Sequence, residues 1–223
     1  MTSSDPALRI EGLRYELGDR VLLDDLGLQV SAGRSLAVTG PSGSGKSTLL
    51  MCALGLVKPD SGTVLVAGSD VTRLSARALA SHRRRHLGVV FQFGELLPEL
   101  SPLENVAIAA LLAGVDRRKA YADAKDLLRW LGVPGQGTTG LLSGGERQRT
   151  AVARALVTDP TVVLADEPTG ALDQRTRETV AELLFDVPAR RGCALVVVTH
   201  DPAVAGRADA QVSLDSGRLV EQS

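Results

Sequence analysis

The sequence predicts an α/β fold in which amphipathic helices alternate with the buried strands of a parallel sheet. Short apolar runs bounded by Gly, Asp or Pro recur along the chain, and such runs are typical of strands covered on both faces. Two amphipathic helical patterns, Ala124 to Leu131 and Val180 to Val187, lie between the runs. In such a sheet the ligand is expected at the carboxyl ends of the strands. The predicted strands are Ser35 to Thr39, Leu87 to Phe91, Thr161 to Ala165 and Ala194 to Thr199.

Two smaller parts are predicted beside this core. The stretch up to Val30 and the segment Gly62 to Val66 are more typical of antiparallel strands than of crossover units, which indicates a small antiparallel β-subdomain. From about Leu96 to Val157 no convincing strand occurs, which predicts an inserted α-helical subdomain. We expect a single domain of residues 1–223, composed of a core with its β-subdomain (1–95 and 158–223) and the helical subdomain (96–157).

Capping signals define the helices of the inserted segment. Ser101 and Glu104 form a capping-box pattern with proline at the first helical position, so a helix should begin at Pro102. Gly132 and Pro134 should close the next helix, because glycine terminates helices and proline cannot continue them.

The composition limits the classes of function that fit the chain. Its 223 residues suffice for one domain with a sizeable apolar core. No apolar run approaches the roughly 20 residues that span a bilayer, and the N-terminus lacks a secretion-signal pattern, so we expect a cytosolic location. A formal net charge of −1 gives no general attraction to nucleic acid, and no such partner is expected. Cys52 and Cys193 lie in apolar contexts and predict buried, reduced thiols.

A glycine-rich motif follows the first predicted core strand and indicates a nucleotide site. It matches the pattern G-x-x-x-x-G-K-[ST], in which backbone N–H groups cradle phosphates and the lysine supplies a positive charge. Ser47 can ligate Mg²⁺, and the helix that follows directs its positive N-terminal end at the anion. A turn that binds nothing would not need this strand and helix around it. We expect the nucleotide to contact Gly40, Pro41, Ser42, Gly43, Ser44, Gly45, Lys46, Ser47 and Thr48.

Two adjacent carboxylates follow the predicted strand Thr161 to Ala165. Asp166 can hold the Mg²⁺ shell opposite Ser47, and Glu167 is positioned to polarise an attacking water. An Asp-Glu pair alone is more typical of a solvated strand end. Beside a phosphate loop on a parallel sheet, the catalytic interpretation is favoured, and the pair indicates nucleotide hydrolysis.

The segment Leu142 to Arg149 predicts a second anion-binding surface. Ser143 and Glu146 form a capping box that opens a helix. Gly144 and Gly145 each cost roughly 1 kcal/mol of helix stability relative to alanine, and a cap alone does not require them. They permit a phosphate to approach the helix N-terminus closely. Because one nucleotide needs only one phosphate cradle, we infer that this surface closes over the nucleotide of a second subunit.

The run Leu142 to Glu146 resembles the signature motif of ATP-binding cassette (ABC) ATPases, and the other motifs match that family in order along nearly the whole chain. The resemblance implies that ATP and Mg²⁺ are bound. It implies that Tyr15 stacks on adenine, that Gln92 senses Mg²⁺ and the γ-phosphate, and that His200 contacts the γ-phosphate. Asp173 matches the loop that communicates between the two subunits.

A finer resemblance is to the group that includes lipoprotein-release, macrolide-efflux and cell-division ATPases. It implies an ATPase on the cytoplasmic face of the membrane that powers a separate membrane-spanning permease through ATP-driven closure of a homodimer or heterodimer. The short, glycine-rich loop Gly135 to Leu141 departs from the usual polar segment before the signature. A non-transport ABC ATPase, either a cell-division regulator or an iron–sulfur assembly ATPase, stays open as an alternative. The resemblance rests on Phe91 to Phe93, Leu96 to Pro98, Leu103 to Ala107 and Asp166 to Gly170.

The loop Gln92 to Ser101 is the predicted docking surface for a cytoplasmic helix of the permease. Its apolar residues Phe93, Leu96 and Leu97 lie in a loop, where exposed apolar groups often mark contacts.

Two further features have plainer interpretations. His82 to His86 is interpreted as a solvated helix end or linker, because the neutral net charge does not favour a lipid or nucleic-acid patch. Trp130 is expected in the core beside its leucine neighbours, with a partner contact as the alternative.

Overall fold

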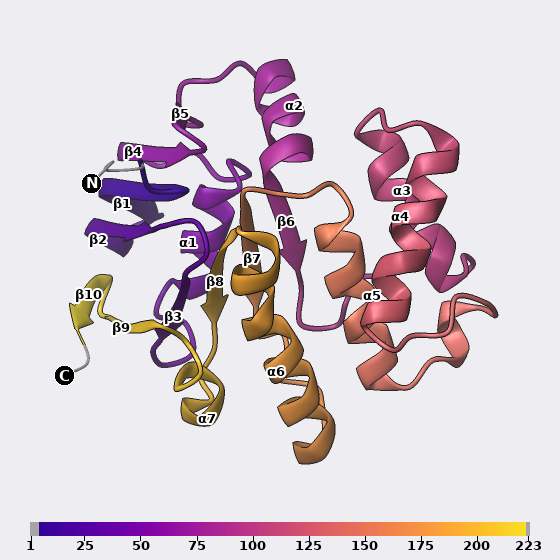
Figure 1. Cartoon of the computed structure of the whole chain (residues 1–223). Helices are drawn as coiled ribbons and strands as arrows, with labels where there is room; N and C mark the ends of the chain where they lie inside the picture. Colours follow the sequence, from indigo (N-terminus) through magenta and orange to yellow (C-terminus); the bar gives the residue numbers. More distant parts are fainter. Residues whose placement is uncertain (1–4, 222–223) are drawn as a thin grey trace.

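A computed structural model describes residues 5–221 and confirms the α/β fold class (Figure 1). The larger sheet has the strand order β10-β9-β3-β8-β7-β6, parallel except for β10. The smaller sheet is antiparallel, with the order β2-β1-β4-β5. The strands of the described residues are β1 (Leu8–Leu17), β2 (Arg20–Val30), β3 (Ser35–Thr39), β4 (Ser61–Val66), β5 (Ser69–Asp70), β6 (Leu87–Val90), β7 (Val162–Asp166), β8 (Ala194–Val198), β9 (Ala210–Asp215) and β10 (Arg218–Glu221).

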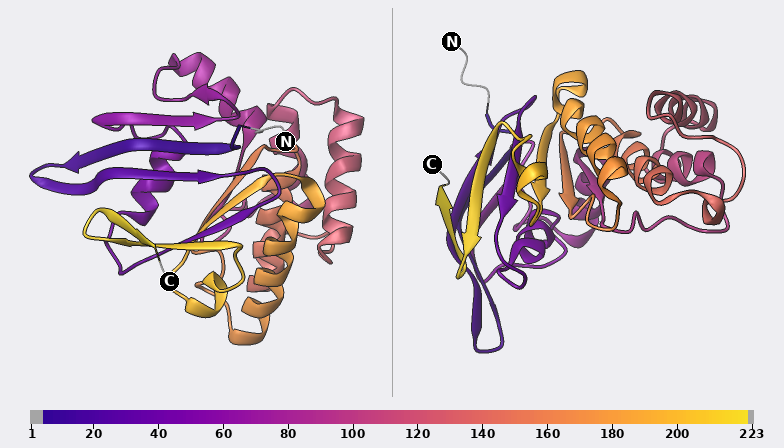
Figure 2. Two further views of the ribbon diagram at one scale, coloured as in Figure 1. Left: turned by 60° about the vertical axis from the view of Figure 1, so that its left-hand side comes forward. Right: turned by 90° about the horizontal axis from the view of Figure 1, so that it is seen from below.

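The helices pack on the parallel sheet, and some of them form a further layer on one side of it. Two further views show the antiparallel sheet and helices α3 to α5 on opposite sides of the parallel sheet (Figure 2). Among the described residues, no helix combines the length and apolar character that crossing a bilayer requires. The helices are α1 (Lys46–Ala53), α2 (Ala76–His86), α3 (Pro102–Leu112), α4 (Arg117–Trp130), the 3₁₀ helix η1 (Thr139–Leu141), α5 (Gly144–Leu156), α6 (Gln174–Arg191) and α7 (Pro202–Ala205).

The hydrophobic core is divided between the two faces of the parallel sheet. On β7, Val163 and Ala165 pack with the side chains of α3 to α6. Val162 and Leu164 point to the other face and pack with α1 and the antiparallel sheet. Because both faces are covered, the strand needs an apolar residue at every position, which explains its continuous apolar sequence.

The predicted strands and helices are confirmed at most positions. Helix α3 begins at Pro102, and the N–H of Ser101 donates to Glu104 Oε2 at 2.9 Å. Helix α4 ends at Trp130, and Gly132 follows with a φ of 64°. The sequence analysis did not identify β9, β10, α2 or α7. Both cysteines are free and buried, as predicted, and burial raises the pKa of Cys52 to about 11.

The prediction of a helix end is confirmed, but the prediction that His82 to His86 is solvated is wrong for part of the segment. Hydrogen bonds hold this end of α2 to other parts of the fold. His82 Nε2 lies 3.0 Å from the carbonyl oxygen of Val66, and His86 Nδ1 lies 3.0 Å from Thr161 Oγ1. Arg83 donates to the carbonyl oxygens that end α1. The segment therefore joins both sheets and α1, although its remaining two arginines are exposed.

Candidate nucleotide-binding site

The phosphate loop connects β3 to α1 at the carboxyl edge of the parallel sheet. Two of its glycines lie where no side chain fits. Gly40 has a φ of 140°, and a Cβ on it would lie 2.2 Å from the carbonyl oxygen of Leu214. Gly45 has a φ of 103°, and its Cβ would lie 2.6 Å from the carbonyl oxygen of Leu22. The loop therefore follows a backbone path, held between β9 and β2, that glycine alone adopts readily.

Lys46 begins α1 and is only 8% exposed. Its Nζ donates to the carbonyl oxygens of Gly40 at 2.8 Å and Pro41 at 2.9 Å. Within residues 5–221 this ammonium forms no direct ion pair, although the Asp166 carboxylate acts on it electrostatically from a greater distance. In the same loop, the buried hydroxyl of Ser44 has no hydrogen-bond partner among the described residues. Because a buried charge without a directly paired counter-ion is costly, these groups fit a highly charged anion such as a polyphosphate.

Asp166 ends β7 near the side chain of Ser47. Burial raises the pKa of Asp166 above its ordinary value, and the interaction with the Ser47 side chain lowers it in part. A hydroxyl and a carboxylate supply oxygen donors of the kind that Mg²⁺ prefers. No group of three or more His, Cys, Asp or Glu side chains is gathered in the described part of the chain. The residues therefore fit a Mg²⁺ ion that takes its other ligands from phosphate and water.

Glu167 follows β7 in a left-handed backbone conformation, with a φ of 44°. Its N–H donates to the carbonyl oxygen of Val198 at 2.9 Å, which ties the residue to the end of β8. Its Oε1 lies 2.8 Å from Nδ1 of the exposed His200. Positive φ at a residue other than glycine costs about 1 kcal/mol or more and persists where neighbouring contacts impose it. The end of β8 therefore fixes both members of this pair.

Gln92 and Asp173 flank the loop that follows Glu167. A Cβ on Gly170, in that loop, would lie 3.1 Å from Gln92 Nε2. Asp173 is the N-cap of α6 and accepts from the N–H of Thr176 at 3.1 Å. The structure thus places Gln92 beside the carboxylate loop and Asp173 at its far end, on an exposed helix cap.

Tyr15 lies on β1 opposite Leu23 of β2 and is half-buried against the core of the antiparallel sheet. Leu23 in turn lies close to the phosphate loop, because a Cβ on Gly45 would be 3.0 Å from its Cδ2. Arg20 also belongs to this site, although no sequence motif indicates it. Its Nη2 donates to the carbonyl oxygen of Gly43 at 3.1 Å. A cleft of about 280 Å³ lies beside the loop and is lined in part by Arg20 and Thr48 but not by Tyr15.

The signature segment opens α5 with the predicted capping box. Ser143 Oγ donates to Glu146 Oε2 at 2.7 Å, and these hydrogen bonds lower the pKa of Glu146. Packing within the chain also favours glycine at both positions, which the local sequence pattern does not indicate. A Cβ on Gly145 would lie 2.4 Å from Thr176 Cγ2, and a Cβ on Gly144 would lie 3.2 Å from a methyl group of Leu172. The signature helix therefore packs directly on the start of α6 and the loop before it.

Side chains of α5 fasten the loop that follows β6. Gln148 Nε2 donates to the carbonyl oxygen of Phe91 at 2.9 Å. Arg154 donates to the carbonyl oxygens of Gly94 at 2.7 Å and Glu95 at 2.6 Å. Burial lowers the pKa of this arginine. The path of the loop is thus set by two polar residues that the sequence analysis did not identify.

The second half of the same loop is held by Asn105 and Thr139. Asn105 is fully buried; its Oδ1 accepts from the N–H of Leu97 at 2.8 Å and its Nδ2 donates to the carbonyl oxygen of Leu97 at 2.9 Å. Thr139 Oγ1 also donates to that carbonyl oxygen, at 2.8 Å. Because the backbone is satisfied internally, the loop keeps its shape while Phe93 and Leu97 face outward.

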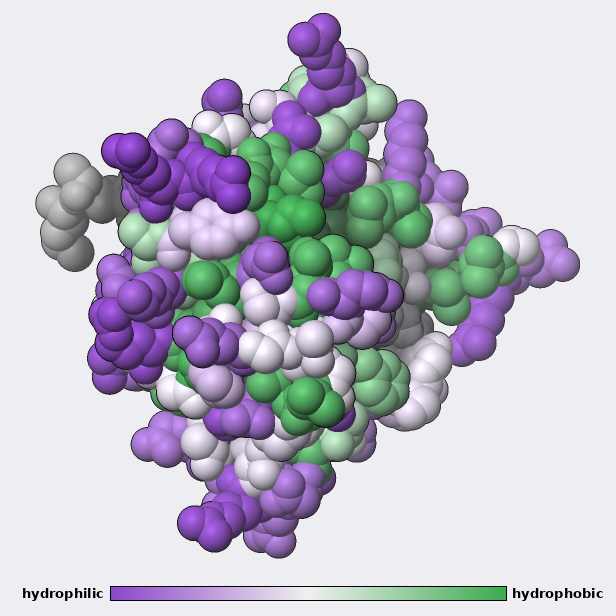
Figure 3. Space-filling view, turned by 90° about the vertical axis from the view of Figure 1, so that its right-hand side faces the viewer, coloured by the Kyte–Doolittle hydropathy of each residue, from purple (hydrophilic) through white to green (hydrophobic). Residues whose placement is uncertain are grey.

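Two of the three expected apolar anchors are exposed. Phe93 is 67% exposed and Leu97 is 46% exposed. Leu96 is half-buried and packs against the core formed by α3 to α5, so for this residue the expectation holds only in part. A space-filling view of the side of the molecule that carries these helices shows hydrophobic surface among hydrophilic groups (Figure 3). Exposed large hydrophobic residues of this part of the chain are Phe93, Leu97, Leu111, Leu112 and Leu141.

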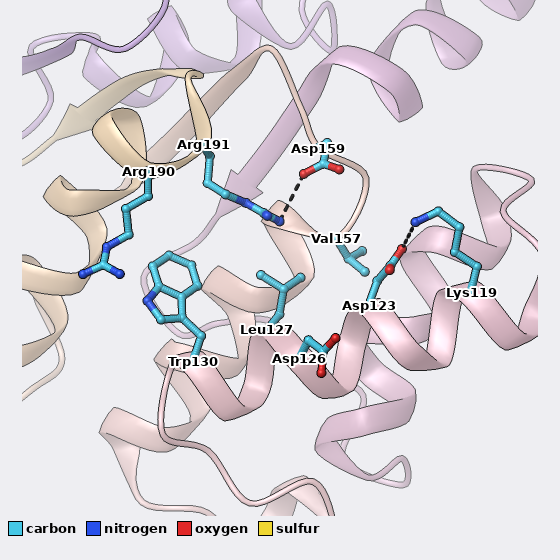
Figure 4. A pocket seen from close by; sticks show the side chains of 9 residues that line it. All are labelled: Lys119, Asp123, Asp126, Leu127, Trp130, Val157, Asp159, Arg190 and Arg191. Atoms are coloured by element: carbon cyan, nitrogen blue, oxygen red, sulfur yellow. Dashed lines mark hydrogen bonds and ion pairs between the residues drawn. The ribbon is translucent and has the colours of Figure 1, made fainter.

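A separate cleft of about 350 Å³ lies where α4 meets the C-terminal end of α6 (Figure 4). Trp130 lines it and is half-buried, so the expectation of a core residue holds only in part, and the Arg190 guanidinium lies 5.6 Å from its ring centre. Helix α6 begins at the nucleotide site, so this end lies about 25 Å along the helix from it. Charged groups around the cleft form the ion pairs Arg191–Asp159 and Lys119–Asp123.

Comparison with known proteins finds a matching family model and similar proteins of nearly the same length. The family model described as ABC transporter matches residues 23–170, more than half of the chain. The lipoprotein-releasing system ATP-binding protein LolD of Chromohalobacter salexigens is 48% identical in an alignment of 222 residues that covers 97% of this chain and 94% of that protein. The LolD of Bacteroides fragilis is 40% identical over 215 residues, 96% of this chain and 100% of that protein.

Solved structures agree over the same span. A dimeric, post-hydrolysis structure of the ATP-binding cassette MJ0796 bound to ADP and Pi matches with a TM-score of 0.86 and 32% identity, covering 97% of each chain. The structure of cbiO1 from Clostridium perfringens, part of the ABC transporter complex cbiONQ, matches with a TM-score of 0.89 and 27% identity, covering 99% of this chain and 89% of that one.

Proposed function

The chain belongs to the ABC transporter family, and on that premise we propose that it is an ATP-hydrolysing subunit that powers a separate membrane-spanning permease. It binds ATP and Mg²⁺, works as a homodimer or heterodimer, and is located at the cytoplasmic face of the membrane through its partner. The process that it drives is lipoprotein release. The near full-length similarity to lipoprotein-releasing ATP-binding proteins supports this choice over a non-transport role.

The buried ammonium of Lys46 is the single observation that carries the nucleotide assignment. It lies in a loop of backbone carbonyls, without an ion pair in the described part of the chain, at the carboxyl edge of a parallel sheet. A polyphosphate supplies a directly bound counter-charge, whereas the Asp166 carboxylate acts on Lys46 only from a greater distance. Its neighbours along this edge are Asp166 and Glu167, so a bound γ-phosphate meets a metal ligand and a water-orienting carboxylate.

Each residue then has a defined part in hydrolysis. Lys46 and the N–H groups of the loop bind the phosphates, and Glu167 orients the attacking water and accepts its proton. His200 Nδ1 lies against Glu167 Oε1, and the other edge of the ring is free to contact the bound γ-phosphate. Bound Mg²⁺, held by Ser47 and Asp166, supplies electrostatic stabilisation of the phosphate charge.

A dimer completes the site, because the signature of a given chain does not line the cleft beside its own phosphate loop. In the proposed arrangement, Ser143 and Gly145 of one copy, carried by the helical subdomain 96–157, cover the γ-phosphate bound by the other. The dimeric state of the MJ0796 cassette supports this arrangement. Binding of two ATP molecules therefore closes the dimer, and hydrolysis releases it because the bridging γ-phosphates are lost.

The permease docks on the loop Gln92 to Ser101. Phe93 and Leu97 are exposed on a loop whose backbone is held in place by hydrogen bonds. An apolar contact surface of this kind is preorganised for binding a partner. Gln92 begins this loop and also lies against Gly170, so displacement of the docked helix and rearrangement around the γ-phosphate are linked through a single side chain.

Genetic replacement in Chromohalobacter salexigens tests the proposed function. In cells depleted of their own LolD, this chain should restore lipoprotein release, and a Lys46→Ala variant should not. Purified protein should hydrolyse ATP only when Mg²⁺ is present. A chain that hydrolyses ATP but does not restore release would contradict the lipoprotein assignment, and a chain without ATPase activity would contradict the whole proposal.

A further inference from the structure

Arg177 connects the two loops that flank the catalytic pair, and no motif assigned above includes it. It lies near the N-terminal end of α6, where its Nη1 donates to Asp201 Oδ2 at 2.8 Å. Its Nη2 donates to the carbonyl oxygen of Leu172 at 3.3 Å. An arginine near a helix N-terminus is disfavoured by the helix dipole, so its position there needs a compensating partner. The Asp201 carboxylate is that partner.

One end of this connection fixes the position of His200. Asp201 directly follows His200, and its other oxygen, Oδ1, caps α7 by accepting from the N–H of Ala203 at 2.9 Å. The N–H of Asp201 donates to Thr199 Oγ1 at 3.1 Å. Both carboxylate oxygens are therefore engaged, and the backbone that carries the exposed His200 ring is held against α6.

The other end reaches the signature helix. Leu172 supplies the carbonyl that Arg177 binds, and its side chain lies against Gly144. Leu172 also immediately precedes Asp173, the cap of α6. Arg177 therefore touches the segment that sets the position of the signature and, through Asp201, the segment that sets the position of His200. Its Nε is buried without a hydrogen-bond partner among the described residues, so the guanidinium is held through Nη1 and Nη2.

We propose that Arg177 is a positioning residue for ATP hydrolysis, which couples the His200 loop to the Leu172–Asp173 loop so that the two move as one unit. This inference rests on the proposed ATPase function. Arg177 touches none of the phosphate-loop residues, so its loss should leave ATP binding intact while His200 loses its alignment. Small misplacements of a group that acts in the transition state lower kcat strongly.

The test measures kcat, KM and the Kd for ATP in purified full-length variants. Arg177→Ala should lower kcat about tenfold or more while KM and Kd change less than about twofold. Arg177→Lys keeps the positive charge but cannot donate from two nitrogens as the guanidinium does, so it should recover part of the lost kcat. Arg175→Ala is the matched control, because Arg175 is an exposed arginine on the same turn, and it should behave as wild type. Fluorescence of Trp130, the single tryptophan, reports whether each variant is folded.

A double-mutant cycle identifies the path of the effect. Asp201→Asn keeps the cap of α7 but loses the charge, and the Arg177→Ala/Asp201→Asn protein should be no slower than the slower single variant. Fully additive losses, or an Arg177→Ala protein as active as Arg175→Ala, would overturn the inference and leave the ATPase assignment standing. A wild-type protein that binds ATP without hydrolysing it would overturn both.

Discussion

Replacing Gly145 with alanine gives a sharp test of how the signature is built. The new Cβ would lie 2.4 Å from Thr176 Cγ2, whereas ordinary contacts between such carbons begin near 3.4 Å. The start of α5 or the start of α6 must therefore move by roughly 1 Å. Thr176 cannot swing away freely, because a β-branched side chain in a helix has few χ1 rotamers.

The expected change in stability is the difference between two opposing effects. Overpacking of this kind costs about 1–3 kcal/mol, with severe contacts in the upper part of the range. Replacement of glycine by alanine inside a helix returns about 1 kcal/mol. The net loss is about 1–2 kcal/mol, which lowers the Tm of a protein of this size by about 3–6 °C.

Thermal unfolding of Gly145→Ala, with and without Thr176→Ser, measures this loss. Thr176→Ser removes the clashing methyl group and keeps the N–H that binds Asp173, so the double variant should regain most of the Tm. If phosphate of a second copy also approaches Gly145, the double variant should still dimerise poorly with ATP. A Gly145→Ala protein as stable as wild type would refute the packing argument, and full recovery of ATP-driven dimerisation would refute the phosphate contact.

Three further outcomes are expected. Glu167→Gln should bind ATP normally and hydrolyse it about 10²-fold to 10⁴-fold more slowly, measured by phosphate release; undiminished turnover would exclude the proposed role. Phe93→Glu should abolish stimulation of ATPase activity by the permease while Leu56→Glu, at an exposed apolar residue outside the docking loop, should not; equal stimulation of both would count against the docking surface. Hydrogen bonds from Ser101 lower the pKa of Glu104 in the folded protein. The stabilisation of the fold by the Glu104 carboxylate is therefore present above the ordinary pKa of the residue, and it is lost as the pH falls through the pKa of the folded protein. Glu104→Gln should therefore show a smaller drop in Tm between neutral and acidic pH than wild type, and an unchanged slope would contradict this assignment.

Features that follow from local chemistry were predictable from the sequence. The strands β3, β7 and β8 were found because a strand buried on both faces must be apolar throughout. The helix starts at Pro102 and Gly144 were found because a capping box satisfies free N–H groups with residues three positions apart. The fold class follows from these units and is confirmed.

Features that depend on distant parts of the chain were not predictable in this way. Strand β9 (Ala210–Asp215) is largely half-exposed and mixes polar with apolar residues, so its pairing with β3 leaves no clear periodic signal. Arg154 has the pattern of an ordinary helix residue, yet it donates to the backbone of Glu95, 59 residues away in the sequence. The need for glycine at 145 arises from Thr176 on another helix, which no local pattern encodes.

Analytical ultracentrifugation of Glu167→Gln with ATP and Mg²⁺ gives the most direct test that each nucleotide is bound between the phosphate loop of one copy and Ser143 of another. We expect a dimer with ATP that is lost with ADP and is weakened by Ser143→Arg. A protein that binds ATP but sediments as a monomer, or a dimer indifferent to Ser143→Arg, would contradict this arrangement.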